Sequence, residues 1–292
     1  MKPTLTIGIA AYNEEKNIGK LLKRLIDLKI ETAQLKKIVV IADGSTDKTV
    51  REIKKVRNTL VTLIHHADRK GKSARLNEIC KKSQTSILVL LDADISILDD
   101  TCIDKLVAPI AKHTADLTSC TVKELPTKTF LGSVLVQSMN FKRKLFNSLH
   151  AGDTIYTCHG RARALSKKLY KKLNFNVYLA DDAYTYLYAK KQKMLYKYVP
   201  ETSVFYRIPE VLSDHVKQSV RFYSSQKEFF KEFGQSKVIA TYKIPKSALF
   251  SHVGRSFLVH PIQTAAYFSV ALISRLSSEK TKAAWSTAYS TK

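Results

Sequence analysis

Short apolar runs alternate with amphipathic helical patterns along the first third of the chain. Four of these runs have the length of β-strands, at residues 5–11, 38–42, 60–64 and 87–91. Helical spacing of apolar residues separates them, at residues 18–28, from 48 onward and at 73–82. We expect Asn13 to cap the first of these helices, because asparagine is a preferred N-cap residue. Apolar strands separated by helices predict an α/β fold, in which a parallel sheet is covered by helices on both faces.

The pattern changes at about residue 126, where longer helical stretches begin. Helices are predicted at residues 130–149, 167–173, 181–191 and 212–233, and short strands at 156–159 and 196–205. Residues 246–258 repeat apolar side chains every three to four positions, which predicts an amphipathic, basic helix. These changes divide the chain into three predicted segments, residues 1–125, 126–235 and 236–292.

The charge of the chain narrows the classes of partner. Lysine and arginine number 49 against 25 aspartates and glutamates, which gives a formal net charge of +24. Nucleic acid, an anionic membrane surface and a phosphorylated substrate all fit such an excess. The four cysteines have neither metal-ligand spacing nor a compact disulfide pattern, so we expect reduced thiols in a cytoplasmic protein.

Two aspartates follow the most apolar of the predicted strands. The stretch SILVLLDADIS places Asp92 and Asp94, a D-x-D pattern, directly after five consecutive apolar residues. Their side chains point the same way on an extended backbone, and two like charges side by side destabilise each other unless a cation lies between them. Mg²⁺ or Mn²⁺, with a substrate diphosphate completing the coordination shell, is one explanation. An aspartate pair that caps the next helix is the other, and strand context leaves both open.

Polar residues also follow the other three predicted strands. Tyr12 and Glu14 follow the first strand, Asp43 follows the second, and Lys72 and Arg75 follow the third. In an open parallel sheet, ligands bind beyond the carboxyl ends of the strands. Lys72 and Arg75 lie three residues apart at the positive end of a predicted helix, which suits a phosphate. Each feature taken singly fits an ordinary cap or loop, but four successive strand ends with complementary chemistry predict one binding site.

The chain resembles the family 2 glycosyltransferases of GT-A fold in four stretches, in the family's order and spacing: AAYNEEKNIGKLL, IADGSTDKT, RKGKSARLN and LLDADIS. The resemblance covers roughly residues 4–225. It implies a Rossmann-like, mostly parallel sheet and a nucleotide-diphosphate sugar as donor. It also implies that Tyr12 and Glu14 line the nucleoside pocket and that Asp43 binds the base. Lys72 and Arg75 would approach the diphosphate.

The resemblance also assigns roles to the acids. Asp94 would be the principal ligand of a Mg²⁺ or Mn²⁺ ion, and Asp92 would face ribose or metal. In YLADDAYTYLYAKKQ, Asp182 corresponds to the family's catalytic base and Asp181 to its neighbour. An inverting transfer needs one carboxylate to take the proton of the acceptor hydroxyl, so one base and one metal suffice. Acids are also common in the first turn of a helix, and that explanation stays open.

A further stretch, KQSVRFYSS, resembles the Gln-x-x-Arg-Trp motif of membrane-associated members such as cellulose, chitin and hyaluronan synthases and ceramide glucosyltransferase. Gln218 and Arg221 match the motif, and Phe222 replaces the tryptophan with another flat ring that can stack on a sugar. The resemblance implies that these residues lie near the acceptor and the diphosphate. Gly160 stands where the family often has an acceptor-side loop, and a missing side chain there permits close approach of the sugar. One turn of an amphipathic helix is the alternative for Arg221 and Phe222.

Two blocks hold more positive charge than one nucleotide needs. Residues 141–172 carry nine lysines or arginines against one aspartate, and residues 226–292 carry ten against three acids. No segment offers eighteen clean apolar residues, since polar residues and a proline interrupt the nearest one, at 257–273. We expect the basic C-terminal helices to attach the protein peripherally to an anionic membrane surface, the inner face of the cell membrane. A helical hairpin packed on the catalytic domain is the alternative.

The sequence therefore predicts an inverting, metal-dependent glycosyltransferase. It would move a hexose or N-acetylhexosamine, most simply from a UDP-sugar, to a lipid-linked or glycan acceptor, as in the synthesis of a cell-envelope polysaccharide. A sugar-1-phosphate nucleotidyltransferase is one alternative, but such enzymes usually carry a glycine-rich basic loop where this chain has AAYNEEKN. A basic nucleic-acid-binding protein is the other. The sequence has no recognised DNA or RNA module, so nucleic acid is not an expected partner.

Overall fold

The structure is a computed structural model that describes residues 1–175 and 180–278, apart from the side chains of residues 220–225, 277 and 278. The chain forms two compact units, each assembled from segments that are separate in sequence. The first unit joins residues 1–123 to 158–206, and the second joins residues 124–157 to those from 207 onward. The sequence analysis divides the chain by expected function into residues 1–125, 126–235 and 236–292, and these segments differ from the two compact units. The functional division stays a prediction.

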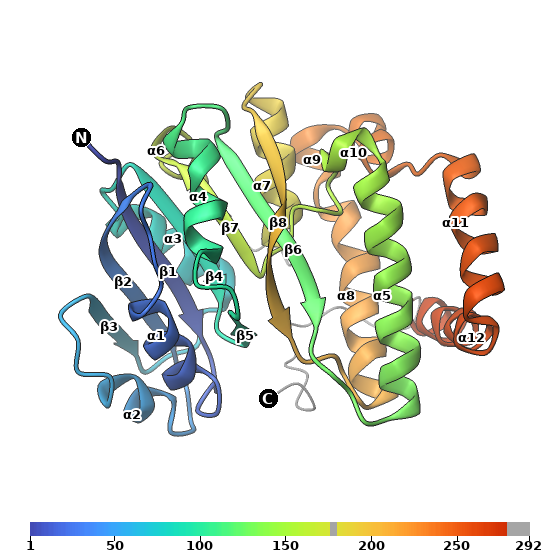
Figure 1. The fold of residues 1–292 in the computed structure, drawn as a ribbon, viewed down its shortest axis with the longest axis horizontal. Helices are drawn as coiled ribbons and strands as arrows, with labels where there is room; N and C mark the ends of the chain where they lie inside the picture. The colour runs from blue at the N-terminus through green and yellow to red at the C-terminus, as the bar shows by residue number, and fades with distance from the viewer. Residues whose placement is uncertain (176–179, 279–292) are drawn as a thin grey trace. The chain divides into compact units, whose positions relative to one another are not determined.

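An eight-stranded sheet forms the centre of the first unit (Figure 1). Its strands lie in the order β3-β2-β1-β4-β7-β6-β8-β5. From β1 to β8 they span Thr4–Ala11, Gln34–Asp43, Val61–His66, Ile87–Asp92, Ile95–Ser96, Leu117–Glu124, Ala162–Ser166 and Tyr196–Tyr206. The pairs β2–β3, β1–β2 and β1–β4 are parallel, whereas β4–β7, β6–β7 and β5–β8 are antiparallel. The parallel part comprises the four strands whose ends carry the predicted motifs.

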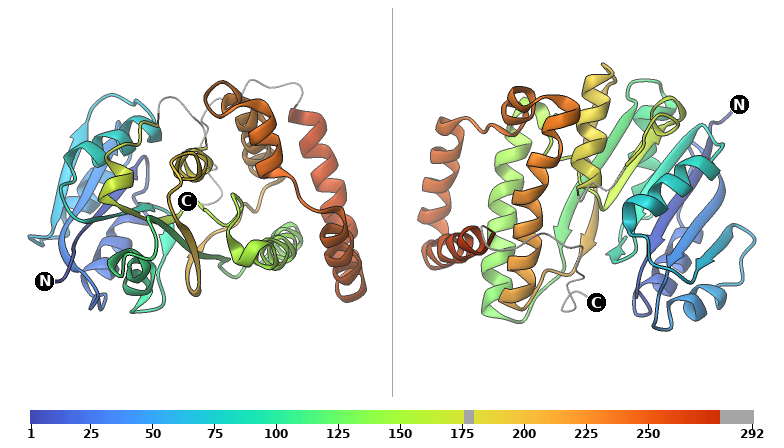
Figure 2. Two further views of the ribbon diagram at one scale, coloured as in Figure 1. Left: turned by 90° about the horizontal axis from the view of Figure 1, so that it is seen from above. Right: turned by 180° about the vertical axis from the view of Figure 1, so that it is seen from behind.

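Helices cover both faces of this sheet, as Figures 1 and 2 show. One face carries α1 (Ile18–Ile26), α2 (Thr49–Lys54) and α4 (Cys102–Ala111), and the other carries α3 (Lys72–Lys82), α6 (Lys167–Tyr170) and α7 (Asp181–Lys191). Alternate β1 residues such as Ile7 and Ile9 join the core under α1 and α4. On the opposite face, a Cβ at Gly8 would clash with Ile79 Cγ2, so only glycine lets α3 pack this closely. The predicted α/β class is confirmed.

The second unit is helical within the part of the chain that the structure describes. Its helices are α5 (Phe130–Ser148), α8 (Leu212–Glu228), α9 (Phe230–Phe233), α10 (Gln235–Tyr242), α11 (Lys246–Val259) and α12 (Pro261–Ser278), with a short 3₁₀ helix η1 (His150–Gly152). The α12 helix packs against α5 and α8, and α11 packs against α5 and α12. Among the described residues, no helix has both the length and the apolar content that a bilayer crossing requires.

One predicted strand is wrong, and three strands, β5, β6 and β7, were not predicted. Residues 156–159 form turns instead of a strand. There the ring of Tyr156 stacks on Phe146 at 4.2 Å between centroids, and its hydroxyl donates a hydrogen bond to Tyr242 O at 2.6 Å. The strands β6 and β7 lack the apolar pattern that predicts a strand, because LTSCTVKE and ARALS mix small and polar residues as loops do. Both strands pair at the antiparallel side of the sheet, where tertiary contacts decide the conformation.

Asn13 does not cap the first helix, which begins only at Ile18. Its φ of 53° lies in the left-handed region that asparagine tolerates better than most residues. Its Oδ1 accepts a hydrogen bond from Thr46 N at 2.8 Å, and its own N–H donates to Ser45 Oγ at 3.2 Å. Asn13 therefore turns the chain after β1 and ties that turn to the loop after β2.

Candidate active site

The carboxyl ends of β1, β2 and β4 lie side by side at one edge of the first unit's sheet. In the parallel register, Ala11 pairs with Ala42 and Ala10 pairs with Asp92. Asp43 is the last residue of β2, and Asp92 is the last residue of β4. The strand order therefore brings together the stretches that the sequence predicts to form one site.

Lys72 contacts one member of each acidic pair. Its Nζ lies 2.7 Å from Asp92 Oδ1 and 3.1 Å from Asp181 Oδ1. Gly71 precedes it with a φ of 90°, which favours glycine, and α3 then begins at Lys72 itself. Burial lowers the pKa of Lys72, but the charges of Asp181 and Asp92 outweigh burial and raise the pKa above its usual value. The Lys72 ammonium therefore stays charged between the acids predicted for metal binding and those predicted for catalysis.

Asp181 is a buried counterion. It begins α7 and is 6% exposed. Its Oδ2 accepts a hydrogen bond at 2.5 Å from Nη2 of Arg163, a fully buried residue of β7. Burial raises the pKa of Asp181, but the charges of Lys72 and Arg163 outweigh burial and lower the pKa to about 2. A carboxylate that two cations hold ionised is a weak base.

Asp182 is half-buried and is oriented by backbone amides. Gly160 N donates a hydrogen bond to its Oδ2 at 3.0 Å, and Ala183 N donates one to its Oδ1 at 2.8 Å. A Cβ at Gly160 would lie 3.4 Å from Asp182 Oδ2 and 3.5 Å from Lys72 Nζ. These distances are ordinary van der Waals contacts, so it is the backbone N–H of Gly160 that holds the carboxylate of Asp182, and the predicted approach of a sugar to Gly160 stays a prediction.

Asp92 and Asp94 lie at the turn that ends β4. Burial, and then the charge of Asp92, raises the pKa of Asp94, as expected for two carboxylates close together. A divalent cation relieves that repulsion, and Mg²⁺ is commonly bound by one or two carboxylates plus substrate phosphates. Within the described residues, no group of three or more histidines, cysteines or acids could hold a metal ion. The aspartate pair therefore fits a cation whose coordination shell is completed by substrate oxygens.

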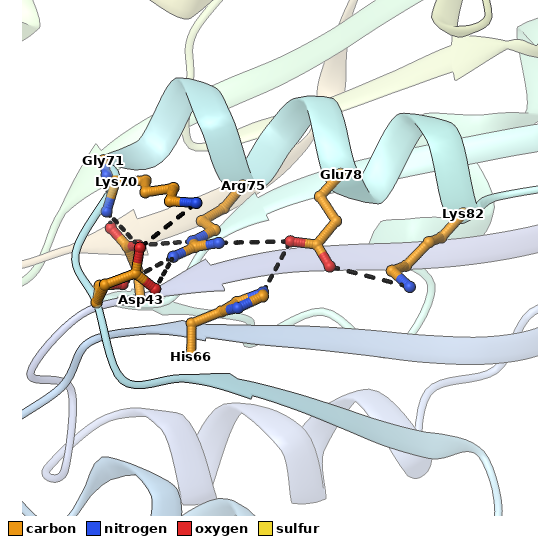
Figure 3. Close-up of polar contacts among 8 residues, drawn as sticks. Asp43, His66, Lys70, Gly71, Arg75, Glu78 and Lys82 are labelled. Carbon is orange, nitrogen blue, oxygen red and sulfur yellow. Dashed lines mark hydrogen bonds and ion pairs between the residues drawn. The ribbon is translucent and has the colours of Figure 1, made fainter.

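Asp43 and Arg75 bind each other, as Figure 3 shows. Asp43 is 2% exposed and accepts hydrogen bonds from Arg75 Nε at 2.6 Å and from Lys70 N and Gly71 N, both at 2.8 Å. Arg75 is 3% exposed, and its Nη1 lies 3.5 Å from Glu78 Oε2. These contacts fix the loop that leads into α3. The contact of Asp43 with a base and that of Arg75 with a diphosphate stay predictions.

Tyr12 and Glu14 follow β1 at the same edge of the sheet. The guanidinium carbon of Arg69 lies 3.9 Å from the centroid of the Tyr12 ring. Glu14 is buried, its Oε2 accepts a hydrogen bond from Asn17 Nδ2 at 2.9 Å, and its N–H donates to Thr49 Oγ1 at 2.6 Å. The loop is well fixed by these contacts, and its predicted role in a nucleoside pocket stays a prediction.

The Gln-x-x-Arg stretch lies on α8 in the second unit. Gln218 is half-buried, whereas the side chains of Arg221 and Phe222 lie outside the described residues. The predicted approach of these three residues to acceptor and diphosphate stays a prediction.

Two arginines at this site escaped the sequence analysis. Arg161 and Arg163 alternate with alanines in HGRARALS, Arg161 immediately before β7 and Arg163 within it. Arg163 binds Asp181, and the guanidinium carbon of Arg161 lies 3.6 Å from the centroid of the Tyr206 ring. The available signal was a pair of arginines two residues apart among alanines and a leucine, because a charged side chain is buried only when something compensates it.

Comparison with known proteins agrees with the motifs. Residues 6–174 match the family model described as glycosyl transferase family 2. The chain is 34% identical over 106 residues to a 4,4'-diaponeurosporenoate glycosyltransferase of Staphylococcus aureus, which is 36% of this chain and 27% of that protein. The match therefore covers only about a quarter of that relative's length.

Solved structures share the fold. A mannosyltransferase from Pyrobaculum calidifontis in complex with GDP-Man and Mn²⁺ gives a TM-score of 0.64 at 20% identity, covering 94% of this chain and 76% of that one. Glucosyl-3-phosphoglycerate synthase from Mycobacterium tuberculosis, in complex with Mn²⁺, UDP-Glc and phosphoglyceric acid, gives 0.54 at 17% identity, covering 76% and 79%. At these identities the likeness is one of fold, and it confirms the predicted GT-A arrangement of the sheet and its helices.

Proposed function

Because the chain belongs to glycosyl transferase family 2, we propose that it moves a hexose or N-acetylhexosamine from a nucleotide-diphosphate sugar to a hydroxyl of a lipid-linked or glycan acceptor. UDP-sugars are the first candidates for the donor. The observation that carries the proposal is the position of Lys72, whose Nζ contacts Asp92 at 2.7 Å and Asp181 at 3.1 Å. One side chain therefore spans the acid that ends β4 and the acid that begins α7.

Asp182 is the general base of this proposal. Its neighbour Asp181 is committed to Lys72 and Arg163 and has a pKa of about 2, so it is poorly suited to accept a proton. Asp182 takes the proton of the acceptor hydroxyl while that oxygen bonds to the anomeric carbon and the bond from this carbon to the diphosphate breaks. A single displacement of this kind inverts the anomeric configuration and forms no covalent enzyme intermediate.

The donor occupies the edge where β1, β2 and β4 end. Tyr12 faces the nucleoside beside the loop that Asp43 holds, Lys72 faces the diphosphate, and Asp94 with Asp92 would hold Mg²⁺ or Mn²⁺. When bound, the metal ion would neutralise negative charge on the departing diphosphate. The raised pKa of Asp94 supports this assignment, because burial and the charge of Asp92 both favour a neutralising partner there.

The surface of α11 and α12 suits a lipid-linked acceptor. Large apolar side chains of these helices are at least 40% exposed, namely Phe250, Phe257, Leu258, Val259, Ile262, Phe268, Leu272, Ile273 and Leu276. Residues 233–278 contain five lysines or arginines and no acid. Exposed apolar side chains among basic ones are typical of helices that lie in the surface of an anionic bilayer. The protein would then work as a peripheral protein at the inner face of the cell membrane.

A thermal-shift panel of nucleotide-diphosphate sugars with Mn²⁺ and with Mg²⁺ tests the proposed donor. A ligand that binds only the folded protein stabilises it by about 2.7 kcal/mol at a concentration of 100 times its Kd. We expect UDP-glucose or UDP-N-acetylglucosamine to raise the Tm only when the metal is present. No shift with any UDP- or GDP-sugar would contradict the proposal. Release of pyrophosphate from UTP and a sugar 1-phosphate would indicate a nucleotidyltransferase instead.

A further inference from the structure

Arg161 lies within the site but binds none of its acids. It is half-buried immediately before β7, and its guanidinium carbon lies 3.6 Å from the centroid of the Tyr206 ring. Its Nε is buried and has no hydrogen-bond partner. Across residues 1–175 and 180–278, no carboxylate forms an ion pair with its side chain. Buried N–H donors of a guanidinium normally find an acceptor, and Arg161 Nε shares the lack of one with Nε and Nη1 of Arg163.

The backbone of Arg161 nevertheless lies directly between the two acidic pairs. Its carbonyl oxygen accepts a hydrogen bond from Asp92 N at 3.0 Å. The residue before it, Gly160, donates its N–H to Asp182 Oδ2 at 3.0 Å. Arg161 is therefore bonded through its own main chain to the metal-binding side of the proposed site and through its neighbour to the proposed base.

Two of the nearby acids are paired without Arg161, whereas Asp94 has the charges of Arg161 and Lys72 close by. Asp92 pairs with Lys72, and Asp181 pairs with Arg163. A structural counterion would be expected to contact one of the acids, as Arg163 does. Arg161 instead rests on an aromatic ring, which holds the guanidinium flat by cation–π contact and leaves its in-plane N–H groups available.

We propose that Arg161 binds a phosphate group of a substrate, either in the diphosphate of the donor or in a phosphate that the acceptor carries. This inference rests on the proposed function and extends it to the chemistry of the substrate. A planar guanidinium fork matches two phosphate oxygens, which is the reason that arginine is enriched where phosphates are bound. The ring of Tyr206 sets the plane of the fork in advance, so little ordering is needed on binding.

Calorimetric titrations of Arg161→Met and Arg161→Lys test this role. The control is Arg57→Met, which removes the same charge from an exposed arginine after α2. The two probes are UDP with Mn²⁺, and inorganic phosphate added to protein already saturated with UDP and Mn²⁺. Loss of charge-assisted hydrogen bonds to a phosphate is expected to weaken binding about ten- to hundredfold. Arg161→Lys keeps the charge but not the fork, so its loss should lie between wild type and Arg161→Met.

The two probes distinguish the source of the phosphate. If the donor supplies it, Arg161→Met weakens UDP binding and Arg57→Met does not. If the acceptor supplies it, UDP affinity is unchanged, and phosphate binding to the UDP complex is lost in Arg161→Met alone. Either result supports the inference.

Other results would overturn it. A wild-type protein that binds UDP, together with an Arg161→Met variant that equals it in both titrations, contradicts this inference and leaves the proposed function standing. A wild-type protein that binds neither probe contradicts both. A large fall in the Tm of Arg161→Met, of about 10 °C or more, would mark Arg161 as a structural residue and would also overturn the inference.

Discussion

At the scale of single residues, the two adjacent aspartates at the start of α7 have different surroundings. Asp181 is buried between Lys72 and Arg163, whereas Asp182 is half-buried and held by the amides of Gly160 and Ala183. Environment rather than residue type separates the roles of neighbouring carboxylates. The sequence places both acids at the start of a helix, but only the structure provides the reason to assign catalysis to the second.

Replacing Arg163 by methionine should destabilise the protein strongly. The substitution leaves the buried carboxylate of Asp181 paired with Lys72 but no longer with Arg163. Breaking a buried ion pair costs about 3–5 kcal/mol. Arg163→Met combined with Asp181→Asn removes both charges and should recover part of this loss. Urea unfolding of the two variants and of Asp181→Asn alone measures the coupling. A loss below about 1 kcal/mol in Arg163→Met would show that the pair is not the anchor that we describe.

At the scale of elements, the segment from Gly160 to Arg163 organises the site. It donates to Asp182 through Gly160, pairs with β4 beside Asp92, and neutralises Asp181 through Arg163. The sequence predicts the first four strands and the position of α7 well, because apolar runs and helical spacing are strong local signals. It does not predict β6 and β7, because small and polar residues become strands there only through pairing with β4 and with each other.

The contrast between local sequence signals and long-range pairing also explains how much of the site could be predicted. Lys72, Asp92 and Asp182 were identified because each stands next to the end of a recognisable element. Arg161 and Arg163 were missed because their importance depends on partners that are distant in the sequence. Such partners are visible only once the strand order is known.

The packing of α8 against its neighbours should make stability depend on pH. Burial, and then the charge of Lys142, lowers the pKa of His215 on α8 from 6.5 to about 4. Between these pH values the unfolded chain binds a proton that the folded chain does not, so the free energy of unfolding falls as the pH drops from about 6.5 to about 4. His215→Gln should lack this part of the fall. Urea midpoints at pH 7 and pH 4.5 measure the difference, and identical pH dependence in both proteins would contradict the prediction.

At the scale of the whole molecule, the distribution of charge and apolar surface supports the proposed attachment to a membrane. The formal net charge is +24, and the helices α11 and α12 combine exposed apolar side chains with basic residues and no acids. Nucleic acid would also attract this charge, but the exposed apolar side chains of α11 and α12 suit a bilayer better. The helices α11 and α12 do pack on α5 and on each other, and α12 also packs on α8, as the alternative of a helical hairpin expects, while their large apolar side chains stay exposed.

Co-sedimentation with vesicles tests this surface. The wild-type protein should bind vesicles that contain phosphatidylglycerol at moderate salt. Leu258 is 87% exposed, and Leu258→Glu should weaken binding about tenfold or more, because burying one leucine in a bilayer contributes about 1.5–3 kcal/mol. Leu98→Glu, at a position 63% exposed in the first unit, is the matched control and should bind like wild type. Wild-type protein that stays in the supernatant would remove the membrane proposal.

The most direct test of the central claim compares Asp94→Ala with Asp182→Asn in two assays, the affinity for UDP in the presence of Mn²⁺ and the turnover of the nucleotide-sugar that gives the largest thermal shift. Asp94→Ala should lose both metal-dependent UDP binding and turnover. Asp182→Asn should keep UDP affinity within about twofold while turnover falls about 10²- to 10⁴-fold, the usual contribution of a general base. Equal loss of UDP binding in the two variants would contradict the division of labour between the two acidic pairs.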